Sequence, residues 1–431
     1  MSQSPRRILL VEFFSRGGLL HYSLQLARSL AAEAASGVDI VLLTAKHPEV
    51  AVAPVGVRML TCLDTWDPHY QPRHLPRRLV RALRALRYAW VWTQVVRVVR
   101  RERPNLILLS DLEHRCDAWF VYLLQCWCRR QQPRAALADV WHNVEAFERD
   151  SNRLQRHLPW REHTARAFDT VFVHGTTLQA QFTRLTGRDA CAIPHGDQVW
   201  FAEQAGPQPD LDQRFQLPPG RPLAMLFGTL NTYKGVDVLL QALTTLPAPS
   251  RPMLLIAGRP TTASQWEAWR RFTQQHHLTD WVRWDRRYVP SAEIAWYFRR
   301  ADWVVLPYRA ASQSGVGHLA LTFGKPLLVT ATGGLPELVD GNGLVVAPGD
   351  PAALAQAMKH MAADAALRQQ WGRRSAELAR TRHAWPPIAR TVLAAAAPGM
   401  LLPAQPIATN AASRSSSIAS GTGIRTQKRV R

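Results

Sequence analysis

The sequence predicts an α/β protein with two domains, each a parallel sheet covered on both faces by helices. The chain of 431 residues is longer than the roughly 250 to 300 residues at which single cores stop growing. Short apolar runs alternate with segments of helical composition through both halves, as in doubly wound sheets. A segment rich in Pro, Gly and Asp interrupts this alternation at 206–222, which indicates a linker.

The first domain is assigned to residues 1–205. Its expected strands are the apolar runs at 8–14, 38–45, 105–111, 136–142 and 170–175. The first run is followed by Gly17-Gly18 and then by a helical pattern. A strand, a glycine loop and a helix in this order open a βαβ unit.

The second domain is assigned to residues 223–380. Its apolar runs include LAMLFGTL, PMLLIAG, DWVVLPY, PLLVTA and GLVVAP. We expect residues 381–397 to form a helix that returns toward the first domain. Residues 398–431 are basic and rich in Ser, Ala, Thr and Gly, a composition that cannot bury a core and is typical of a disordered tail.

The charge of the chain points to anionic partners. Lys and Arg number 53 against 32 Asp and Glu, a formal charge of +21. Much of the excess lies in 71–104, which contains ten Arg and one Glu. A nucleic-acid-binding protein is therefore an alternative, but no helix-turn-helix, RNA-binding aromatic signature or zinc-finger spacing is recognisable. We expect no nucleic-acid partner.

Features of cysteine and hydropathy favour a cytoplasmic protein. The five cysteines are unpatterned, as expected of reduced thiols. No run of about 18 uninterrupted apolar residues is present, so no membrane-spanning helix is expected.

Glycine loops follow three of the expected strands, at Gly17-Gly18, at 228–235 and at Ser314-Gly315. Ligands of parallel sheets bind at the carboxyl ends of the strands, and a glycine loop that leads into a helix suits an anion. Lys234 stands directly before such a helix, where its ammonium could neutralise a diphosphate. The plain alternatives are tight turns and a solvated surface lysine.

The combined order of GTLNTYKGVDVLLQAL, LLIAGRP, ADWVVLPYRAASQSGVGHLALTFGKP and IPHGD resembles glycosyltransferase family 4. These are retaining nucleotide-sugar transferases of GT-B fold. The amino half agrees through RGGLLHYSLQLARSLA, VWHNVEAFERD and TVFVHGTTLQAQF, so the resemblance covers about residues 6 to 395. It implies two Rossmann-like domains that face each other across a cleft.

The resemblance also implies roles for particular positions. Lys234 would hold the donor diphosphate, and His142 would contact the transferred sugar; these two are the catalytic candidates. The alternative for His142 is a histidine satisfied within the core. The other donor-binding candidates are Gly17, Gly18, Gly228, Thr229, Gln313, Ser314, Gly315 and Val316. Contacts to the base are expected near Arg259 and Tyr288, with GDP- and UDP-linked donors both open.

Acceptor contacts are expected from His21, Tyr22, Glu145 and Glu148, although surface salt bridges would explain the two glutamates equally well. No Asp-x-Asp motif stands in the expected setting, so we expect neither metal nor cofactor. Two glutamates that are usual in the family are replaced by Ala311 and Leu319. A GT-B protein that binds sugar nucleotides with little or no turnover is therefore a further alternative.

The basic stretch is expected to form an amphipathic helix. Leu79, Leu83, Leu86 and Trp90 share one helical face. This face could pack on the sheet with the arginines in solvent, and the arginine-rich helix would also suit an anionic membrane surface. The candidate membrane residues are Arg77, Arg78, Arg81, Arg84, Arg87, Trp90 and Trp92.

Together these expectations describe a hexosyltransferase of bacterial exopolysaccharide or cell-surface polysaccharide synthesis. The enzyme would move a hexose from a nucleotide-diphosphate sugar to a glycan or polyprenyl-linked saccharide, in the cytoplasm and peripherally on the inner face of the plasma membrane.

Overall fold

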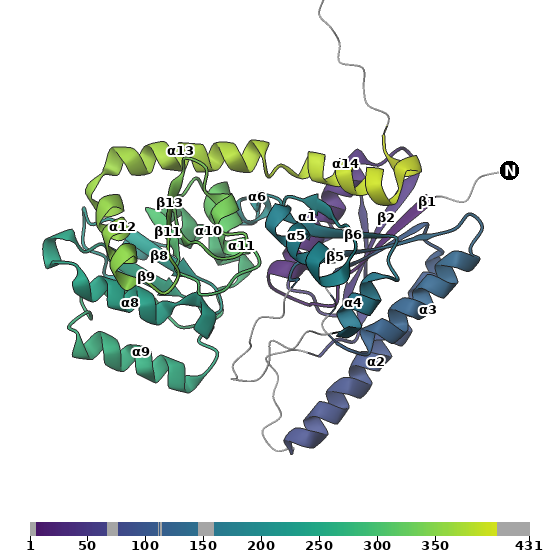
Figure 1. Cartoon of the computed structure of the whole chain (residues 1–431), viewed down its shortest axis with the longest axis horizontal. Coiled ribbons are helices and arrows are strands. Elements are labelled where there is room, and N and C mark those ends of the chain that lie inside the picture. Colours follow the sequence, from purple (N-terminus) through teal and green to yellow (C-terminus); the bar gives the residue numbers. More distant parts are fainter. Residues whose placement is uncertain (1–5, 67–75, 111, 113, 145–158, 403–431) are drawn as a thin grey trace, which may run out of the picture.

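The computed structural model describes residues 6–66, 76–110, 112, 114–144 and 159–402. Two α/β domains lie side by side in it, the amino-terminal one in purple to teal and the carboxyl-terminal one in green (Figure 1). All paired strands within each sheet are parallel. This architecture confirms the predicted fold class.

The first sheet has seven strands in the order β3-β2-β1-β4-β5-β6-β7. The strands are β1 (Arg6–Val11), β2 (Val38–Ala45), β3 (Val57–Leu63), β4 (Leu106–Ser110), β5 (Ala136–Trp141), β6 (Thr170–His174) and β7 (Cys191–Ile193). The helices are α1 (Gly18–Glu33), α2 (Arg77–Glu102), α3 (Asp117–Arg130), α4 (Pro159–Ala165), α5 (Gly175–Thr186) and α6 (Val199–Glu203). The edge strands β3 and β7 were not expected from the sequence, because one is partly exposed and the other has only three residues.

The second sheet has six strands in the order β10-β9-β8-β11-β12-β13. The strands are β8 (Leu223–Phe227), β9 (Met253–Ala257), β10 (Val282–Asp285), β11 (Trp303–Leu306), β12 (Leu327–Thr330) and β13 (Gly343–Val346). The helices are α8 (Val236–Thr245), α9 (Ala263–Gln275), α10 (Ser291–Arg300), α11 (Gly315–Thr322), α12 (Pro351–Ala363) and α13 (Ala365–Thr381), with short 3₁₀ turns η1 (Thr232–Lys234), η2 (Ala248–Ser250) and η3 (Pro336–Leu338).

The segment expected as a linker contains a short helix, α7 (Leu211–Phe215). Asp210 caps this helix by accepting hydrogen bonds from the amides of Asp212 and Gln213, and Leu211 and Phe215 are buried with the core of the second domain. Much of this segment therefore belongs structurally to the second domain.

The last helix, α14 (Trp385–Ala396), leaves the second domain and packs on the first, and Figure 1 shows it following α13 across the top of the molecule. Ile388, Val392 and Leu393 are buried in one cluster with Ile8 and Leu24. The burial of this apolar face joins the end of the chain to the first domain.

Residues 398–402 correct the expected boundary of the tail. They form a 3₁₀ turn, η4 (Pro398–Met400), followed by two residues that pair with the end of α1. The amide of Ala35 donates to Met400 O at 2.8 Å, and Met400 is buried. An apolar Met-Leu-Leu sequence makes this docking favourable. The rest of the expected tail lies outside the described residues.

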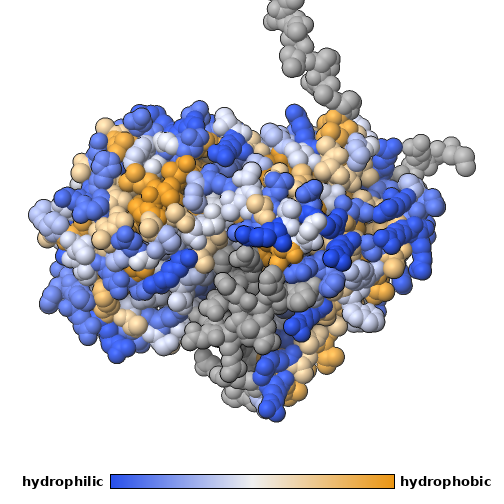
Figure 2. Space-filling model, in the orientation of Figure 1, coloured by the Kyte–Doolittle hydropathy of each residue, from blue (hydrophilic) through white to orange (hydrophobic). Residues whose placement is uncertain are grey.

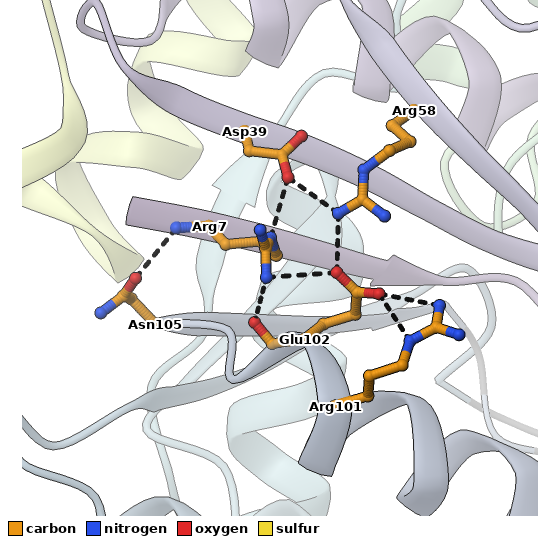
Figure 3. A network of polar contacts seen from close by, with 6 residues as sticks. All are labelled: Arg7, Asp39, Arg58, Arg101, Glu102 and Asn105. Atoms are coloured by element: carbon orange, nitrogen blue, oxygen red, sulfur yellow. Dashed lines mark hydrogen bonds and ion pairs between the residues drawn. The ribbon is translucent and has the colours of Figure 1, made fainter. Parts of the chain in front are cut away.

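An ion-pair network closes the amino-terminal edge of the first sheet (Figure 3). Asp39 accepts from Arg7 Nε and Arg58, each at 2.8 Å. The Glu102 carboxylate pairs with Arg58 at 2.7 Å and Arg101 at 2.8 Å. The hydrogen bond from Arg58 lowers the pKa of Glu102 by more than burial raises it. The network fixes the end of α2 at the sheet edge opposite to the carboxyl ends of the strands.

In the part of the chain that the structure describes, no helix combines the length and apolarity that crossing a bilayer requires.

Candidate functional site

The carboxyl ends of both sheets border one cavity of about 220 Å³. The first domain contributes His174 and His195 to its lining, and the second contributes Gln313, Ser314 and His318. His383, between α13 and α14, also lines it. A cavity at this place is where parallel sheets bind their ligands.

Lys234 lies beside this edge, in the turn η1 that precedes α8. Its side chain is 6% exposed; Nζ donates to Phe227 O at 3.0 Å and lies 5.4 Å from the centroid of the Tyr308 ring. Burial lowers the pKa of Lys234 to about 8. Among the described residues no carboxylate forms an ion pair with this ammonium. Burying a cation without a counter-ion costs free energy. A bound anion would supply the counter-ion, so the unpaired ammonium is suited to an anion-binding site.

Gly228 brings the lysine next to the amino end of α11. Its φ is +94°, and a Cβ added there would lie 2.9 Å from Lys234 Nζ and 3.6 Å from Val316 Cγ2. Any side chain at this position would therefore separate two groups that the sequence predicts to act together. The lysine and the first turn of α11 flank one backbone position.

At the amino end of α11, the Ser314 side chain caps the amide of Gly317. Ser314 Oγ accepts from the amide of Gly317 at 3.2 Å. The first amides of a helix have no partner within the helix, so those of Gly315 and Val316 are suited to an anion at the positive end of the helix dipole. Gln313 Oε1 is buried without a hydrogen bond from the described residues.

The glycine pair of the first domain starts α1. Gly17 has φ +83°, and a Cβ at Gly17 or Gly18 would meet nothing within 4 Å. The amide of Gly17 donates to Glu49 Oε2 at 3.1 Å. There is therefore open space beside both glycines. The loop is connected to the second domain through Glu49, which accepts from Gly17 and also from Tyr288 and Ser291.

Glu49 and Glu337 each connect one domain to the other, and neither was expected from the sequence. Glu49, from the first domain, accepts from the Ser291 amide at the start of α10 at 3.1 Å and from Tyr288 Oη at 2.8 Å. Glu337, from the second domain, accepts from the Thr177 amide at the start of α5 at 2.9 Å. Each carboxylate therefore meets the positive end of a helix dipole across the interface.

The electrostatics of Glu49 reflect this position. Burial by itself raises the pKa of the carboxyl, but the neighbouring His21 imidazole and the hydrogen bonds from Tyr288 and the Gly17 amide outweigh it and lower the pKa to about 2. Gly175, with φ +82°, is needed at the other contact, since a Cβ there would lie 2.2 Å from Glu337 Oε2. The observed arrangement therefore has the domains in direct contact beside the cavity.

His142 follows β5 and belongs to a cluster of buried histidines. Its Nδ1 lies 3.1 Å from His174 Nε2, and the ring of Tyr22 packs edge-on against it at 4.6 Å. Burial lowers the pKa of His142 and of His174 well below the usual range, with the neighbouring imidazoles adding to the effect. The rings of His195 and His318 stack across the domain interface at 4.6 Å.

The remaining predicted residues are placed as follows. His21 is buried against Trp200 and Phe201, with Nε2 3.5 Å from Glu49 Oε2. Tyr22 is fully buried beneath the histidines. The sequence-predicted sites Thr229 and Arg259 are exposed, whereas Ala311 and Leu319 are buried apolar residues. Glu145 and Glu148 lie outside the described residues.

The amphipathic helix packs differently from one expectation. Leu79, Leu83, Leu86 and Trp90 remain exposed, so this face does not pack on the sheet. The following residues Val91, Trp92, Val95, Val98 and Val99 pack instead. The physical reason is visible in Figure 1, where the amino-terminal half of α2 projects beyond the sheet.

The candidate membrane residues divide into two groups. Trp92 is 0% exposed and donates through Nε1 to Asp117 at 2.9 Å, so the prediction that it faces a membrane is wrong. Arg87 is held by Asp64 at 2.8 Å, and Arg84 lies over the Trp66 ring. Arg78 and Arg81 are exposed, and the side chain of Arg77 lies outside the described residues.

Helix α3 adds exposed apolar residues that the sequence analysis did not consider. They are Trp119, Tyr122 and Leu123, of which Trp119 is 77% exposed. The ring of Phe120, on the same helix, stacks on Trp92 at 5.1 Å, so α3 lies beside α2. Figure 2 shows hydrophobic and hydrophilic surface next to each other where α2 projects.

The second domain is similar to known glycosyltransferases. Residues 221–364 match the family model described as Glycosyl transferases group 1. The matched segment contains Gly228, Lys234 and the start of α11. A D-inositol 3-phosphate glycosyltransferase of Xylanimonas cellulosilytica is 33% identical over 187 residues, which are 42% of this chain and 44% of that protein. One from Streptomyces avermitilis is 32% identical over 173 residues, 38% of this chain and 37% of that protein. The matches thus span less than half of the curated relatives.

Solved structures agree over nearly the whole chain. Sucrose-phosphate synthase from Thermosynechococcus elongatus superimposes with a TM-score of 0.68 at 23% identity, over 89% of this chain and 96% of that one. HepE from Anabaena, solved with UDP and glucose, has a TM-score of 0.65 at 17% identity, over 90% and 98%. These likenesses show that the fold is GT-B.

Proposed function

We propose that this protein is a retaining hexosyltransferase that uses a nucleotide-diphosphate sugar and a glycan or lipid-linked saccharide acceptor. The observation that carries the proposal is the buried Lys234 ammonium, which lacks a described counter-ion and lies across Gly228 from Val316 in the first turn of α11. The amides of Gly315 and Val316 donate no hydrogen bond to the described residues. A diphosphate would supply the missing negative charge.

The proposed mechanism relies on stabilisation of the leaving group. Charge develops on the diphosphate as the glycosidic bond breaks, and prepositioned donors at that point lower the barrier most effectively. Lys234 and the amides of Gly315 and Val316 are such donors. The acceptor hydroxyl would attack from the same face, and the departing phosphate would help to take its proton. His142 would contact the transferred sugar. This step needs no divalent ion at the diphosphate.

The donor is proposed to carry uridine in preference to guanosine. The support comes from HepE, whose structures contain UDP with glucose and UDP-glucose. The acceptor is proposed to be a polyprenyl-linked saccharide of cell-surface polysaccharide synthesis. The names of the curated relatives offer inositol 3-phosphate as the competing acceptor, but their similarity covers less than half of the chain.

A donor screen followed by product analysis tests this function. UDP and a UDP-hexose are expected to raise the melting temperature, because they bind the folded state alone. GDP-hexoses are expected to raise it less. Anomer analysis of the product should show that the configuration of the donor is retained. Absence of stabilisation by every nucleotide sugar, or an inverted product, would contradict the proposal.

One observation favours a second candidate, a GT-B protein that binds donors without turnover. Ala311 and Leu319 replace two glutamates usual in the family that the sequence resembles, and both are buried apolar side chains. Stabilisation by a UDP-hexose, with neither transfer to polyprenyl-linked or inositol acceptors nor hydrolysis, would favour this candidate.

We further propose that the enzyme binds an anionic membrane through α2 and α3. The exposed stripe Leu79, Leu83, Leu86 and Trp90 would enter the interface together with Trp119, and Arg78 and Arg81 would meet lipid phosphates. Amphipathic helices with basic and aromatic residues bind such surfaces. This placement would put the enzyme at the inner face of the plasma membrane, where lipid-linked acceptors lie.

Vesicle flotation tests the membrane surface. Replacing Arg78 and Arg81 with Gln is expected to weaken binding to vesicles that contain phosphatidylglycerol about thirtyfold, since each basic residue contributes about 1 kcal/mol. The matched control is the pair Arg270→Gln and Arg271→Gln on α9, which removes the same charge from an exposed helix of the other domain. Equal losses from both pairs would show that net charge alone drives binding.

A further inference from the structure

Three histidines stand at the carboxyl ends of three adjacent strands of the first domain. In the sheet, Trp141 pairs with Val173, so His142 and His174 occupy neighbouring positions. His174 pairs with Ile193, and His195 follows Ile193 by two residues. Because strand side chains alternate with a period of two, the backbone favours all three side chains on one side of the sheet.

The ring nitrogens are close enough to share an ion. One ring nitrogen from each of His142, His174 and His195 lies within 4.8 Å of the other two, and the closest separation, between His142 Nδ1 and His174 Nε2, is 3.1 Å. Metal–nitrogen bonds of about 2.0 to 2.1 Å in a tetrahedral site place the nitrogens roughly 3.3 Å apart. The pair His142 and His174 therefore has nearly this spacing, and a nitrogen of His195 lies within 4.8 Å of both.

The three rings lie in the interior of the protein. The nitrogens that face each other, His142 Nδ1 and His174 Nε2, share a hydrogen bond, which an ion bound between the rings would replace. The opposite nitrogens of these two rings, His142 Nε2 and His174 Nδ1, have no hydrogen bond from the described residues, and neither has His195 Nδ1. All three side chains are more than nine-tenths buried.

We propose that His142, His174 and His195 bind a divalent ion of the zinc class. Three imidazoles with neither carboxylate nor thiolate suit Zn²⁺, Co²⁺ or Ni²⁺ and disfavour Mg²⁺, which prefers oxygen ligands. His174 and His195 line the cavity of about 220 Å³, so a water from the cavity can complete a tetrahedral site. Glu337, also in that lining, is engaged at the start of α5.

This site differs from any ion at the diphosphate, because its ligands are nitrogens of the first domain whereas Lys234 belongs to the second. The sequence expectation of no metal rested on the missing Asp-x-Asp motif and did not consider these histidines together. A bound ion would also restrict the sugar contact proposed for His142, so the ion is expected to inhibit transfer. That consequence rests on the proposed function, whereas metal binding itself does not.

Titration of the untagged protein with Co²⁺ tests the site without donor or acceptor. We expect one equivalent to bind with the intense visible bands of tetrahedral Co²⁺, which Zn²⁺ then displaces and Mg²⁺ does not. His174→Phe and His195→Phe keep an aromatic ring in the cluster and remove its nitrogens. Each is expected to weaken Co²⁺ binding at least about a hundredfold, because a three-ligand site loses one ligand.

His383→Phe is the matched control. His383 lines the same cavity and contacts His318 but is not one of the three ligands, so its variant should bind Co²⁺ as the wild type does. Melting temperatures establish that each variant is folded. The proposal is overturned if the wild-type protein shows no tetrahedral spectrum. It is equally overturned if the folded His174 and His195 variants retain wild-type affinity.

Discussion

Lys234→Met is expected to stabilise the free protein and at the same time to abolish most donor binding. Methionine has nearly the length of lysine and carries no charge, so it removes an ammonium that is buried without a described counter-ion. We expect the free energy of unfolding at pH 7 to rise by about 1 to 3 kcal/mol, in line with a pKa lowered from 10.5 to about 8. Affinity for a UDP-hexose should fall about a hundredfold, because the diphosphate loses a buried charge partner.

The pH dependence gives this prediction a second measurement. The native state disfavours the charged lysine, so the penalty is complete below pH 8 and disappears as the pH rises toward 10.5. The stabilisation by methionine should therefore shrink over that interval. Wild-type donor affinity should decline above about pH 8, and that of the variant should lack this step. Calorimetric titration with the donor measures both.

Lys325→Met is the control for this experiment. Lys325 is also partly buried with a lowered pKa, and its Nζ donates to Arg299 O at 2.9 Å. Lys325 lies at the amino-terminal end of β12, whereas Lys234 lies beyond the carboxyl-terminal end of β8, so the two lysines are at opposite ends of the parallel strands. Donor affinity should be unchanged in this variant. If Lys234→Met binds the donor as well as wild type does, the assigned role of Lys234 is wrong.

Trp385→Ala is expected to cost about 3 to 5 kcal/mol of stability, as large-to-small changes of buried aromatic residues do. The indole starts α14 and fills the contact with the first domain: Nε1 donates to Asp197 O at 2.9 Å, and the ring lies 5.3 Å from that of Tyr22. Gly196 faces the indole so closely that a Cβ would lie 2.4 Å from it. The cavity left by alanine would loosen the attachment of α14.

Urea unfolding followed by far-ultraviolet circular dichroism measures this loss. Trp385→Phe keeps one six-membered aromatic ring but loses the rest of the indole together with the hydrogen-bonding nitrogen, so it should lose less than alanine does, about 1 to 3 kcal/mol. Trp119→Ala is the exposed control and should change stability by no more than about 0.5 kcal/mol. Similar unfolding midpoints for Trp385→Ala and Trp119→Ala would show that α14 contributes little to the first domain.

Much of the fold could be predicted from local sequence. The central strands β8 and β9 are apolar along their whole length, and β1 and β4 are apolar over most of theirs, because helices cover both faces of each sheet. The edge strands β3 and β7 lack this signature, since β3 contains Arg58 and Thr61 and β7 has only three residues, and they were missed. The exposed leucines of α2 were assigned correctly to one helical face, but periodicity alone could not show that this face extends beyond the sheet.

Part of the candidate site could also be predicted, because some of its residues belong to local sequence patterns. Lys234, Gly228 and Ser314 stand in glycine loops that directly follow strands, a signal carried by neighbouring residues. Glu49, Glu337, His174 and His195 had no equivalent signal, because each acts through residues distant in sequence. Their positions at or beyond strand ends were the only local sign, and many polar residues share that sign.

The sequence by itself determined two parallel-sheet domains and the loops that can hold an anion, since both follow from the burial of short apolar segments and from the backbone freedom of glycine. Only the tertiary structure decided what those loops face. Packing within the second domain buried Lys234 without a described counter-ion. Contact between the domains placed Glu49 and Glu337 on helix ends of the opposite domain, and the order of the strands in the first sheet brought His142, His174 and His195 together. These are properties of burial and distance between remote segments, and no local pattern specifies them.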